Sequence, residues 1–393
     1  MDLFTTSNLP SSTSFDITSL LDSASSIGEA GGPRHHQNFI KFLQYATALR
    51  LNILPLTWEP ALEALGRDGA TAKVNQSFLN SEMTLVYKRF KSEVTDHRLS
   101  EAQFRELQYA AVINELIILA RPEIGDHDGI VRFVGICFEL SPNAVEVWPV
   151  LVLLKATRGD LATYMTQNES LEPARLLTIC GEIAKGVHRV HHYGKLSYRW
   201  LVLHDDNGVD LNHYLGVIHG DINPRNILVW HDVQSDGMAV VLADFGFSIF
   251  GAMDDLVKLA RSEPWDAPEW HPREFKLKDA KKMDVYSFGL VCLWLFFGNN
   301  TLLDLGLPST TVKTAFMGGS RDAIARIQSR KKDNDSILEW ALKLLAKKTD
   351  LDGEIRHRLE RVFTLALARD PHRRPSSMEA LIEILVDGSS EVT

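Results

Sequence analysis

Cysteines are scarce in this chain, and it has no long apolar run. Its 393 residues include only three cysteines, which lie far apart inside apolar segments: Cys137, Cys180 and Cys292. That pattern favours buried thiols in a reducing compartment over a disulfide framework or a zinc site. The strongest apolar run, Phe288 to Phe297, is too short to cross a bilayer, and no basic segment leads into an apolar stretch at the N-terminus. We therefore expect an intracellular protein, cytoplasmic or nuclear, without a membrane span.

Positive charge is also in short supply. Lysine and arginine number 42 against 51 aspartates and glutamates, which gives a formal net charge of -9. A general nucleic-acid binder would carry a basic patch, whereas the short basic run Arg330-Lys331-Lys332 is followed at once by Asp333. We therefore expect no nucleic-acid partner. With 45% hydrophobic and 24% charged residues, the composition is that of an ordinary globular protein, and it leaves the oligomeric state unknown.

The most informative motif is a polar run over residues 219–226, HGDINPRN, followed after a short β-rich stretch by Asp244-Phe245-Gly246. Asp221 is an acid able to orient a hydroxyl. The Asn226 amide and the Asp244 carboxylate can hold Mg²⁺ around a nucleotide. Each piece alone is typical of ordinary loops and turns, but their joint order and spacing indicate phosphoryl-transfer chemistry.

Further motifs follow in the order of one known family. They are Leu85-Val86-Tyr87-Lys88, Asn114-Glu115-Leu116, Ala267-Pro268-Glu269, the segment from Asp284 to Gly289, and the arginine motif from Arg369 to Pro375. On these residues, over roughly positions 55–385, the chain resembles the eukaryotic protein kinase family, and its Ser/Thr type more than its Tyr type. The resemblance implies an α+β, two-lobed protein kinase-like fold. One lobe is a small antiparallel β-sheet with one key helix, and the larger lobe is mainly α-helical.

Local patterns divide the chain into segments. Residues 1–35 are rich in Ser and Thr and are predicted to be a disordered tail. We expect an N-terminal helical extension over 36–54, the first lobe over 55–155, the second lobe over 156–386, and a tail over 387–393. In the extension, Phe39, Phe42, Leu43, Tyr45 and Ala46 recur with helical spacing, which predicts an amphipathic helix that packs on the first lobe or on a partner, with the lobe favoured.

Element boundaries can also be predicted. Ser100 with Gln103 forms a candidate capping box for the helix of the first lobe, expected over about 100–120. β-type segments are expected over 84–90, 131–138 and 150–154. Helices of the second lobe are expected over 161–165, 173–191, 284–297, 336–347, 354–368 and 377–386.

The resemblance assigns roles to individual residues. It implies that Asp221 accepts or orients the proton of the substrate hydroxyl and that Asn226 and Asp244 coordinate Mg²⁺. Lys88 would hold the α and β phosphates of ATP, and Glu115 would pair with that lysine. The alternative partner for Lys88 is Glu106, which lies on the same predicted helix as Glu115.

The nucleotide contacts are less well marked. In the loop that covers the nucleotide, the resemblance places Arg67, Gly69 and Ala72 where the family has three glycines, so only Gly69 is retained. An ordinary turn between strands remains open there. At the hinge, Ala156 would bond the adenine through its backbone, with Leu153 behind the base, and Asp160 would bond the ribose.

Two positions near Asp221 depart from the family pattern, and a third position could compensate for one of them. Gly220 replaces the usual arginine, so control by phosphorylation of the activation segment is not favoured. Asn223 replaces the phosphate-contacting lysine of Ser/Thr kinases. Arg225 stands where tyrosine kinases carry an arginine that compensates for the absence of that lysine.

Glu269 and Arg374 are expected to form the family's buried ion pair. Ser248 and Ser262 lie in the activation segment, but serines are common in loops and a phosphorylation site there is not favoured.

Residues 195–216 interrupt the join that the family makes between residues 194 and 217. Two explanations remain open and equally weighted. The segment is either a retained intron translated in this gene model or a surface loop, whose closure costs little more as it lengthens.

The leading functional hypothesis is an ATP-dependent protein kinase that transfers the γ-phosphoryl group to a protein hydroxyl, on Ser or Thr. The alternative is a pseudokinase that serves as a nucleotide-binding or scaffold module. A small-molecule kinase is disfavoured because Ala267-Pro268-Glu269 resembles a platform for peptide substrates. The cofactors implied are ATP and Mg²⁺, and the partner implied is a protein substrate.

Overall fold

The computed structural model describes residues 34–54, 63–68, 72–78, 84–90, 100–140, 147–168, 171–192, 215–232, 237–317 and 321–386. The predicted tail over 1–35 lies almost wholly outside these residues, as do Gly69, residues 195–214 of the interruption, and the tail over 387–393. Leu215 and Gly216, the last residues of the interruption, begin strand β6. The predicted domain limits and both explanations of the interruption therefore stay predictions.

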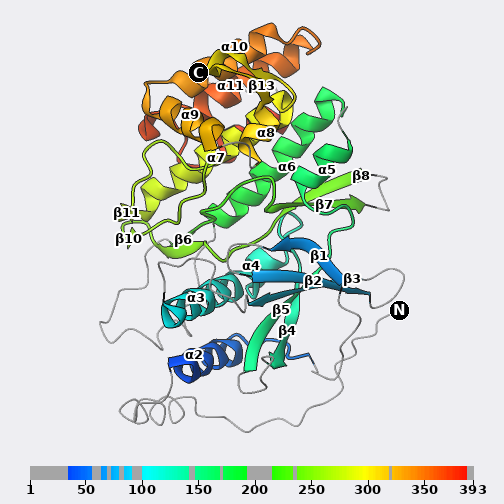
Figure 1. Cartoon of the computed structure of the whole chain (residues 1–393), viewed down its shortest axis with the longest axis vertical. Helices are drawn as coiled ribbons and strands as arrows, with labels where there is room; N and C mark the ends of the chain where they lie inside the picture. The colour runs from blue at the N-terminus through cyan, green and yellow to red at the C-terminus, as the bar shows by residue number, and fades with distance from the viewer. Residues whose placement is uncertain are drawn as a thin grey trace.

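The first half of the chain forms a five-stranded sheet in the order β1-β2-β3-β5-β4, with every neighbouring pair antiparallel. Its strands are β1 (Glu63–Asp68), β2 (Ala72–Phe78), β3 (Thr84–Phe90), β4 (Phe133–Leu140) and β5 (Val147–Leu154). Figure 1 shows this sheet in the lower half of the molecule, next to helix α3 (Glu101–Leu119). The predicted small antiparallel sheet with one key helix is confirmed, and β3 has the predicted bounds.

Helix α3 begins where its sequence predicts. The Ser100 hydroxyl accepts the Gln103 backbone N–H, and the Gln103 side chain accepts the Ser100 N–H at 3.0 Å, so the capping box satisfies donors that the helix start leaves free. The helix runs on to short α4 (Pro122–Gly125). Leu116 and Ile117 are buried on α3, which fixes its rotation and turns Glu115, only 1% exposed, inward.

Helix α2 (Arg34–Ala48) packs on α3, as predicted for the amphipathic segment. Phe42 is fully buried, and its ring meets the Phe138 ring of β4 edge-on at a centroid distance of 6.4 Å. After the helix, Ile53 bridges in parallel to Ile136, whose N–H donates to the Asn52 carbonyl. The segment after α2 therefore extends the sheet beyond β4 while α2 covers α3.

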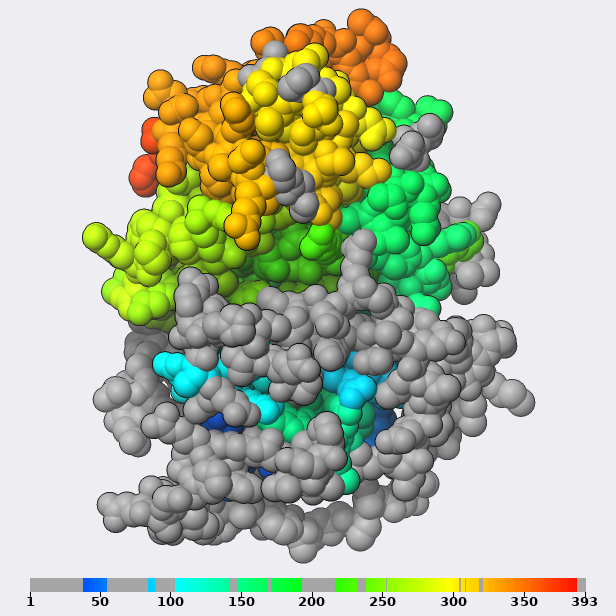
Figure 2. All heavy atoms as spheres, in the orientation of Figure 1, coloured from blue at the N-terminus to red at the C-terminus, as the bar shows by residue number. Residues whose placement is uncertain are grey.

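The second half is mainly helical and surrounds α7 (Leu277–Phe297), which is buried along nearly its whole length. Its other helices are α5 (Leu161–Gln167), α6 (Pro173–His191), α8 (Val312–Phe316), α9 (Arg321–Lys332), α10 (Ser336–Lys347), α11 (Gly353–Ala366) and α12 (Glu379–Val386). In the space-filling view this half makes up the coloured upper part of the molecule (Figure 2). The α6 and α10 bounds were predicted correctly. Helix α7 begins seven residues earlier than predicted because Ala280 and Lys281 are buried as well.

Short strand pairs hold the polar motifs. Strand β6 (Leu215–Ile218) pairs with β9 (Ile249–Ala252), and β7 (Ile227–Asp232) pairs with β8 (Gly237–Leu242). Further two-residue or five-residue strands are β10 (Leu256–Val257), β11 (Phe275–Lys276), β12 (Thr301–Leu302) and β13 (Leu307–Thr311). Because Ile227 lies opposite Leu242, the loop after β6 and the loop after β8 meet at one end of the β7–β8 pair.

No helix in the described part of the chain is both long and apolar enough to cross a membrane.

Candidate functional site

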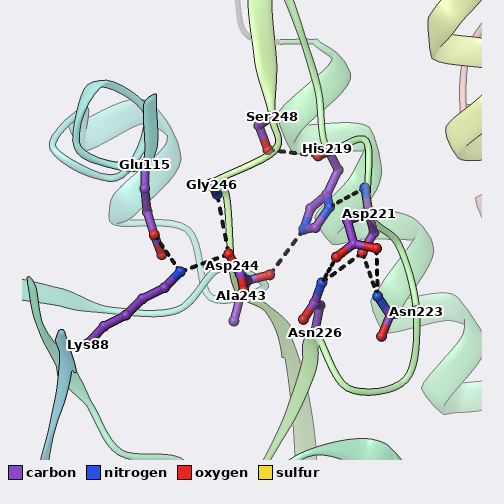
Figure 3. Close-up of polar contacts among 10 residues, drawn as sticks. All are labelled: Lys88, Glu115, His219, Asp221, Asn223, Asn226, Ala243, Asp244, Gly246 and Ser248. Carbon is purple, nitrogen blue, oxygen red and sulfur yellow. Dashed lines mark hydrogen bonds and ion pairs between the residues drawn. The ribbon is translucent and has the colours of Figure 1, made fainter. Parts of the chain in front are cut away.

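Three charged side chains meet between the sheet and the helical half. The Lys88 Nζ atom, on β3, lies 2.6 Å from Glu115 Oε2 on α3 and 2.8 Å from Asp244 Oδ1 in the loop after β8 (Figure 3). Glu106, the alternative partner, is exposed on α3. The structure therefore brings Lys88, Glu115 and Asp244 together and leaves Glu106 out.

The two carboxylates keep the lysine charged. Burial alone would lower the pKa of Lys88, but the nearby charges of Asp244 and Glu115 outweigh it and raise that pKa above its usual value. Burial would raise the pKa of Asp244, yet Lys88 and the Gly246 N–H hold it below its usual value. An ammonium fixed in this way is suited to bind phosphate oxygens.

Asp221 accepts hydrogen bonds from three side chains. Asn226 Nδ2 donates to Oδ2 at 2.7 Å, and Asn223 Nδ2 donates to Oδ1 at 2.9 Å. The Ser262 hydroxyl, from the activation segment, also donates to Oδ1. A carboxylate offers about four lone-pair positions. When the contacts of the described residues are counted, one position on Oδ2 remains open to a further hydrogen-bond donor. A hydroxyl group is one kind of donor that such a position can accept.

Backbone contacts hold the loop of Asp221 in place. The buried Asp284 of α7 accepts the His219 N–H at 2.8 Å and the Gly220 N–H at 3.0 Å, and His191 Nε2 lies 2.8 Å from the same carboxylate. The His219 ring packs on Phe245 at a centroid distance of 5.0 Å. This packing links the loop of Asp221 to the loop of Asp244.

Gly220 has a conformational reason to be glycine. Its φ is +76°, and an added Cβ would lie 2.9 Å from the Phe247 carbonyl oxygen. Both the left-handed backbone and the close oxygen disfavour a side chain here. The sequence predicts that position 220 lacks the usual cation, and the backbone conformation found there also favours glycine.

Asn226 and Asp244 have the donor chemistry for Mg²⁺. Asn226 uses its Nδ2 atom on Asp221, and Asp244 uses Oδ1 on Lys88 and on the Gly246 N–H, 3.3 Å away. Among the described contacts this leaves the Asn226 Oδ1 and Asp244 Oδ2 atoms, hard oxygen ligands of the kind Mg²⁺ takes beside water and phosphate. No cluster of three or more His, Cys, Asp or Glu residues suited to a metal occurs in the described ranges.

The predicted nucleotide contacts differ in how the structure places them. Ala156 follows β5 and is 5% exposed, and its backbone N–H has no hydrogen-bond partner within the described residues. Asp160 caps α5: its Oδ1 atom accepts the Thr163 N–H at 2.8 Å and its Oδ2 atom the Thr163 hydroxyl at 2.9 Å. Its ribose contact stays a prediction, and Gly69 lies outside the described residues.

Two predictions on charged residues have different outcomes. Arg374 pairs with Glu269 as expected, with distances of 2.6 and 2.9 Å between the guanidinium nitrogens and the carboxylate oxygens, and the arginine is fully buried while the Glu269 side chain is 22% exposed. The compensating role considered for Arg225 stays a prediction. The Arg225 Nη2 atom donates to the Met317 carbonyl at 2.8 Å, at the end of α8.

The contact between Ser262 and Asp221 could not be predicted from the sequence, which indicates only a disfavoured phosphorylation site at Ser262. Its hydroxyl is engaged with Asp221 and is half-buried. The residue type carries no signal of this contact, because serines are common in loops; the fold creates it.

Replacing Ser262 with alanine is expected to shift the pH dependence of phosphoryl transfer. Burial raises the pKa of Asp221 above its usual value, while the Ser262 hydrogen bond stabilises the ionised form and opposes that rise. Without Ser262 the pKa rises further, so activity that needs the carboxylate is lost at a higher pH as the solution is acidified. The measurement is kcat/KM against pH. Ser309→Ala, an exposed position, is the control, and an unshifted acid limb in S262A would contradict the assignment.

Replacing Glu115 with glutamine is expected to lower kcat/KM about 10- to 100-fold, because one charge-assisted hydrogen bond that positions Lys88 is lost. Glu106→Gln, on the exposed side of the same helix, should leave the rate unchanged. Steady-state kinetics with varied ATP tests both variants. Equal losses in the two would show that Glu115 has no special part in the site.

Comparisons with known proteins agree with this geometry. The sequence model described as "Protein kinase domain" matches residues 61–384. The chain is 29% identical over 200 residues to the inactive tyrosine-protein kinase kin-32 of Caenorhabditis elegans, covering 50% of this chain and 19% of that protein.

Two yeast proteins are also similar. Identity is 25% over 195 residues to the serine/threonine-protein kinase shk1/pak1 of Schizosaccharomyces pombe, with 49% of this chain and 24% of that protein covered. Identity is 36% over 116 residues to the serine/threonine-protein kinase ppk34 of the same organism, with 28% and 30% covered. The chain thus matches less than a third of the length of each of these relatives.

Proposed function

Because the chain belongs to the protein kinase family, we propose that it is an ATP-dependent protein kinase that transfers the γ-phosphoryl group to a serine or threonine hydroxyl. The observation that carries the proposal is the joint arrangement of Lys88 with its two carboxylates and of Asp221 with a free acceptor position. An intracellular location is proposed from the free cysteines Cys137, Cys180 and Cys292.

Phosphoryl transfer asks the protein mainly for positioning and charge neutralisation. The acceptor hydroxyl donates its hydrogen bond to Asp221 and attacks the γ-phosphorus. The bond from that phosphorus to the β-γ bridging oxygen breaks, ADP leaves, and Asp221 takes the hydroxyl proton. Lys88 holds the α and β phosphates. Mg²⁺ held through Asn226 and Asp244 would neutralise charge on the phosphates.

The preference for Ser or Thr rests on the loop sequence and on the relatives. Pro224 matches the Ser/Thr pattern, and two of the similar proteins carry serine/threonine-protein kinase in their names. The Arg225 side chain, which stands where tyrosine kinases have an arginine, is engaged with Met317. These observations favour a small alcohol as the acceptor.

The experiment is phosphorylation of generic protein substrates with γ-labelled ATP and Mg²⁺, followed by hydrolysis and identification of the labelled amino acid. Phosphoserine or phosphothreonine supports the proposal. Label on tyrosine would overturn the acceptor class, and no label from a folded protein would overturn the activity.

A scaffold function is the second candidate, because one similar protein is named as an inactive kinase. Nucleotide binding alone does not distinguish a scaffold from an active kinase, since a scaffold can also bind ATP. Turnover decides between the two: the scaffold hypothesis expects none with any substrate, and the presence of Lys88, Asp221, Asn226 and Asp244 favours the enzyme.

A further inference from the structure

Lys331 is a buried cation outside the site described above. It lies on the last turn of α9 and is 2% exposed. Its Nζ atom donates to the Pro264 carbonyl, to the Asp266 carbonyl at 2.6 Å and to Asp266 Oδ1 at 3.2 Å. An ammonium without such acceptors would be costly to bury, so its place in the fold depends on the segment that supplies these oxygens.

A second side chain of α9 contacts the same segment, residues 261–267 of the activation segment. Gln328 lies one turn before Lys331 on the same face of α9, and its Nε2 atom donates to Asp266 Oδ1 at 2.5 Å. Asp266 also accepts Arg261 Nε at 3.2 Å. Figure 1 shows α9 in the upper half of the molecule, where it contacts α8. Helix α9 thus contacts the segment both at the backbone carbonyls of Pro264 and Asp266 and at the Asp266 carboxylate.

The same segment reaches Asp221, the proposed general base. The Ser262 carbonyl accepts the Asp266 N–H at 2.9 Å, which closes a turn, and the Ser262 hydroxyl donates to Asp221. The end of α8 meets the catalytic loop as well, through Arg225 and the Met317 carbonyl. The end of α8 therefore contacts the loop of Asp221 through Met317, and α9 contacts the segment that contains Ser262 through Gln328 and Lys331.

The positive charge of Lys331 matters because position 220, in the loop of Asp221, lacks the usual cation. Gly220 leaves the loop of Asp221 without the cation that would hold a phosphorylated activation segment. Lys331 supplies a cation to the same segment from within the fold. Burial lowers the pKa of Lys331 to about 8, so it is mostly charged at neutral pH.

We propose that Lys331 is a positioning residue: it fixes residues 261–267 against Asp221 and so sets how the acceptor protein is held. The inference rests on the proposed function for its kinetic consequence and on contacts alone for its structural one. Phosphorylation of the activation segment is then unnecessary to hold the segment in place.

The test compares the full chain with Lys331→Met, which keeps the length of the side chain and removes its charge. The matched control is Lys332→Met, on the exposed neighbouring residue. Amide hydrogen exchange over residues 258–270 should be about tenfold faster in K331M, since acceptors of a buried donor are left unsatisfied. Exchange over α6 should not change. If the parent is a kinase, KM for the protein substrate should rise about tenfold while KM for ATP does not.

Asp266→Asn is the second variant, for the case in which K331M does not fold; it removes the charge partner and should accelerate exchange in the same segment. Unchanged exchange over 258–270 in the folded variants overturns the inference, as does an equal change in K332M. A parent that phosphorylates nothing overturns the proposed function, while the exchange result still decides the role of Lys331.

Discussion

Replacing Asp221 with asparagine is expected to lower phosphoryl transfer about 10²- to 10⁴-fold, the usual contribution of a positioned general base. Asparagine keeps the size of the side chain but cannot take the proton. Its amide nitrogen would also face the Asn223 or Asn226 Nδ2 donors, which now bond to the carboxylate. ATP affinity should be preserved, because these contacts belong to the acceptor side of the site.

Initial rates at saturating ATP measure the loss, and nucleotide titration checks the preserved affinity. Asp333→Asn changes an exposed carboxylate in the loop after α9 and should leave both unchanged. A D221N protein that retains the parent rate would remove Asp221 from the mechanism.

Replacing Arg374 with methionine is expected to reduce the free energy of unfolding by about 3–5 kcal/mol, the usual cost of breaking a buried ion pair by removing one partner. The Arg374 side chain is fully buried and lies over the Tyr286 ring at 4.7 Å. Besides Glu269 it donates to three carbonyl groups, those of Ala368, Lys282 and Arg369. All of these acceptors would lose their donor.

The neighbouring Arg373 is a stringent control. Its side chain is 50% exposed and pairs with Asp335, so Arg373→Met should cost only about 0–1 kcal/mol. Denaturant unfolding of the two variants gives the comparison. Similar losses in both would mean that Arg374 contributes no more than a surface arginine.

The sequence predicts best where local chemistry decides the structure. The start of α3 follows from Ser100 and Gln103 alone, since a capping box needs only residues three positions apart. The approach of Lys88, Glu115 and Asp244 could be predicted only through the family resemblance, because they come from a strand, a helix and a loop far apart in the chain.

Burial of charge was the hardest feature to predict. Arg330-Lys331-Lys332 looks like a short solvated run, yet Lys331 lies inside the fold because α9 turns it toward the carbonyls of the activation segment. Helix α9 itself was not expected, because few of its residues are apolar and most are polar or charged. The positive φ of Gly220 likewise depends on contacts with Asp284 of α7 and with Phe247, which sequence alone does not place.

The most direct test of the central claim is Mg²⁺-dependent transfer of the γ-phosphoryl group from ATP to protein, measured for the full chain and for Asp244→Asn. We expect the parent to transfer phosphate only with Mg²⁺, and we expect D244N, folded and equally soluble, to transfer little or none. A folded parent that binds ATP with Mg²⁺ and transfers nothing, or a D244N protein as active as the parent, would contradict the claim.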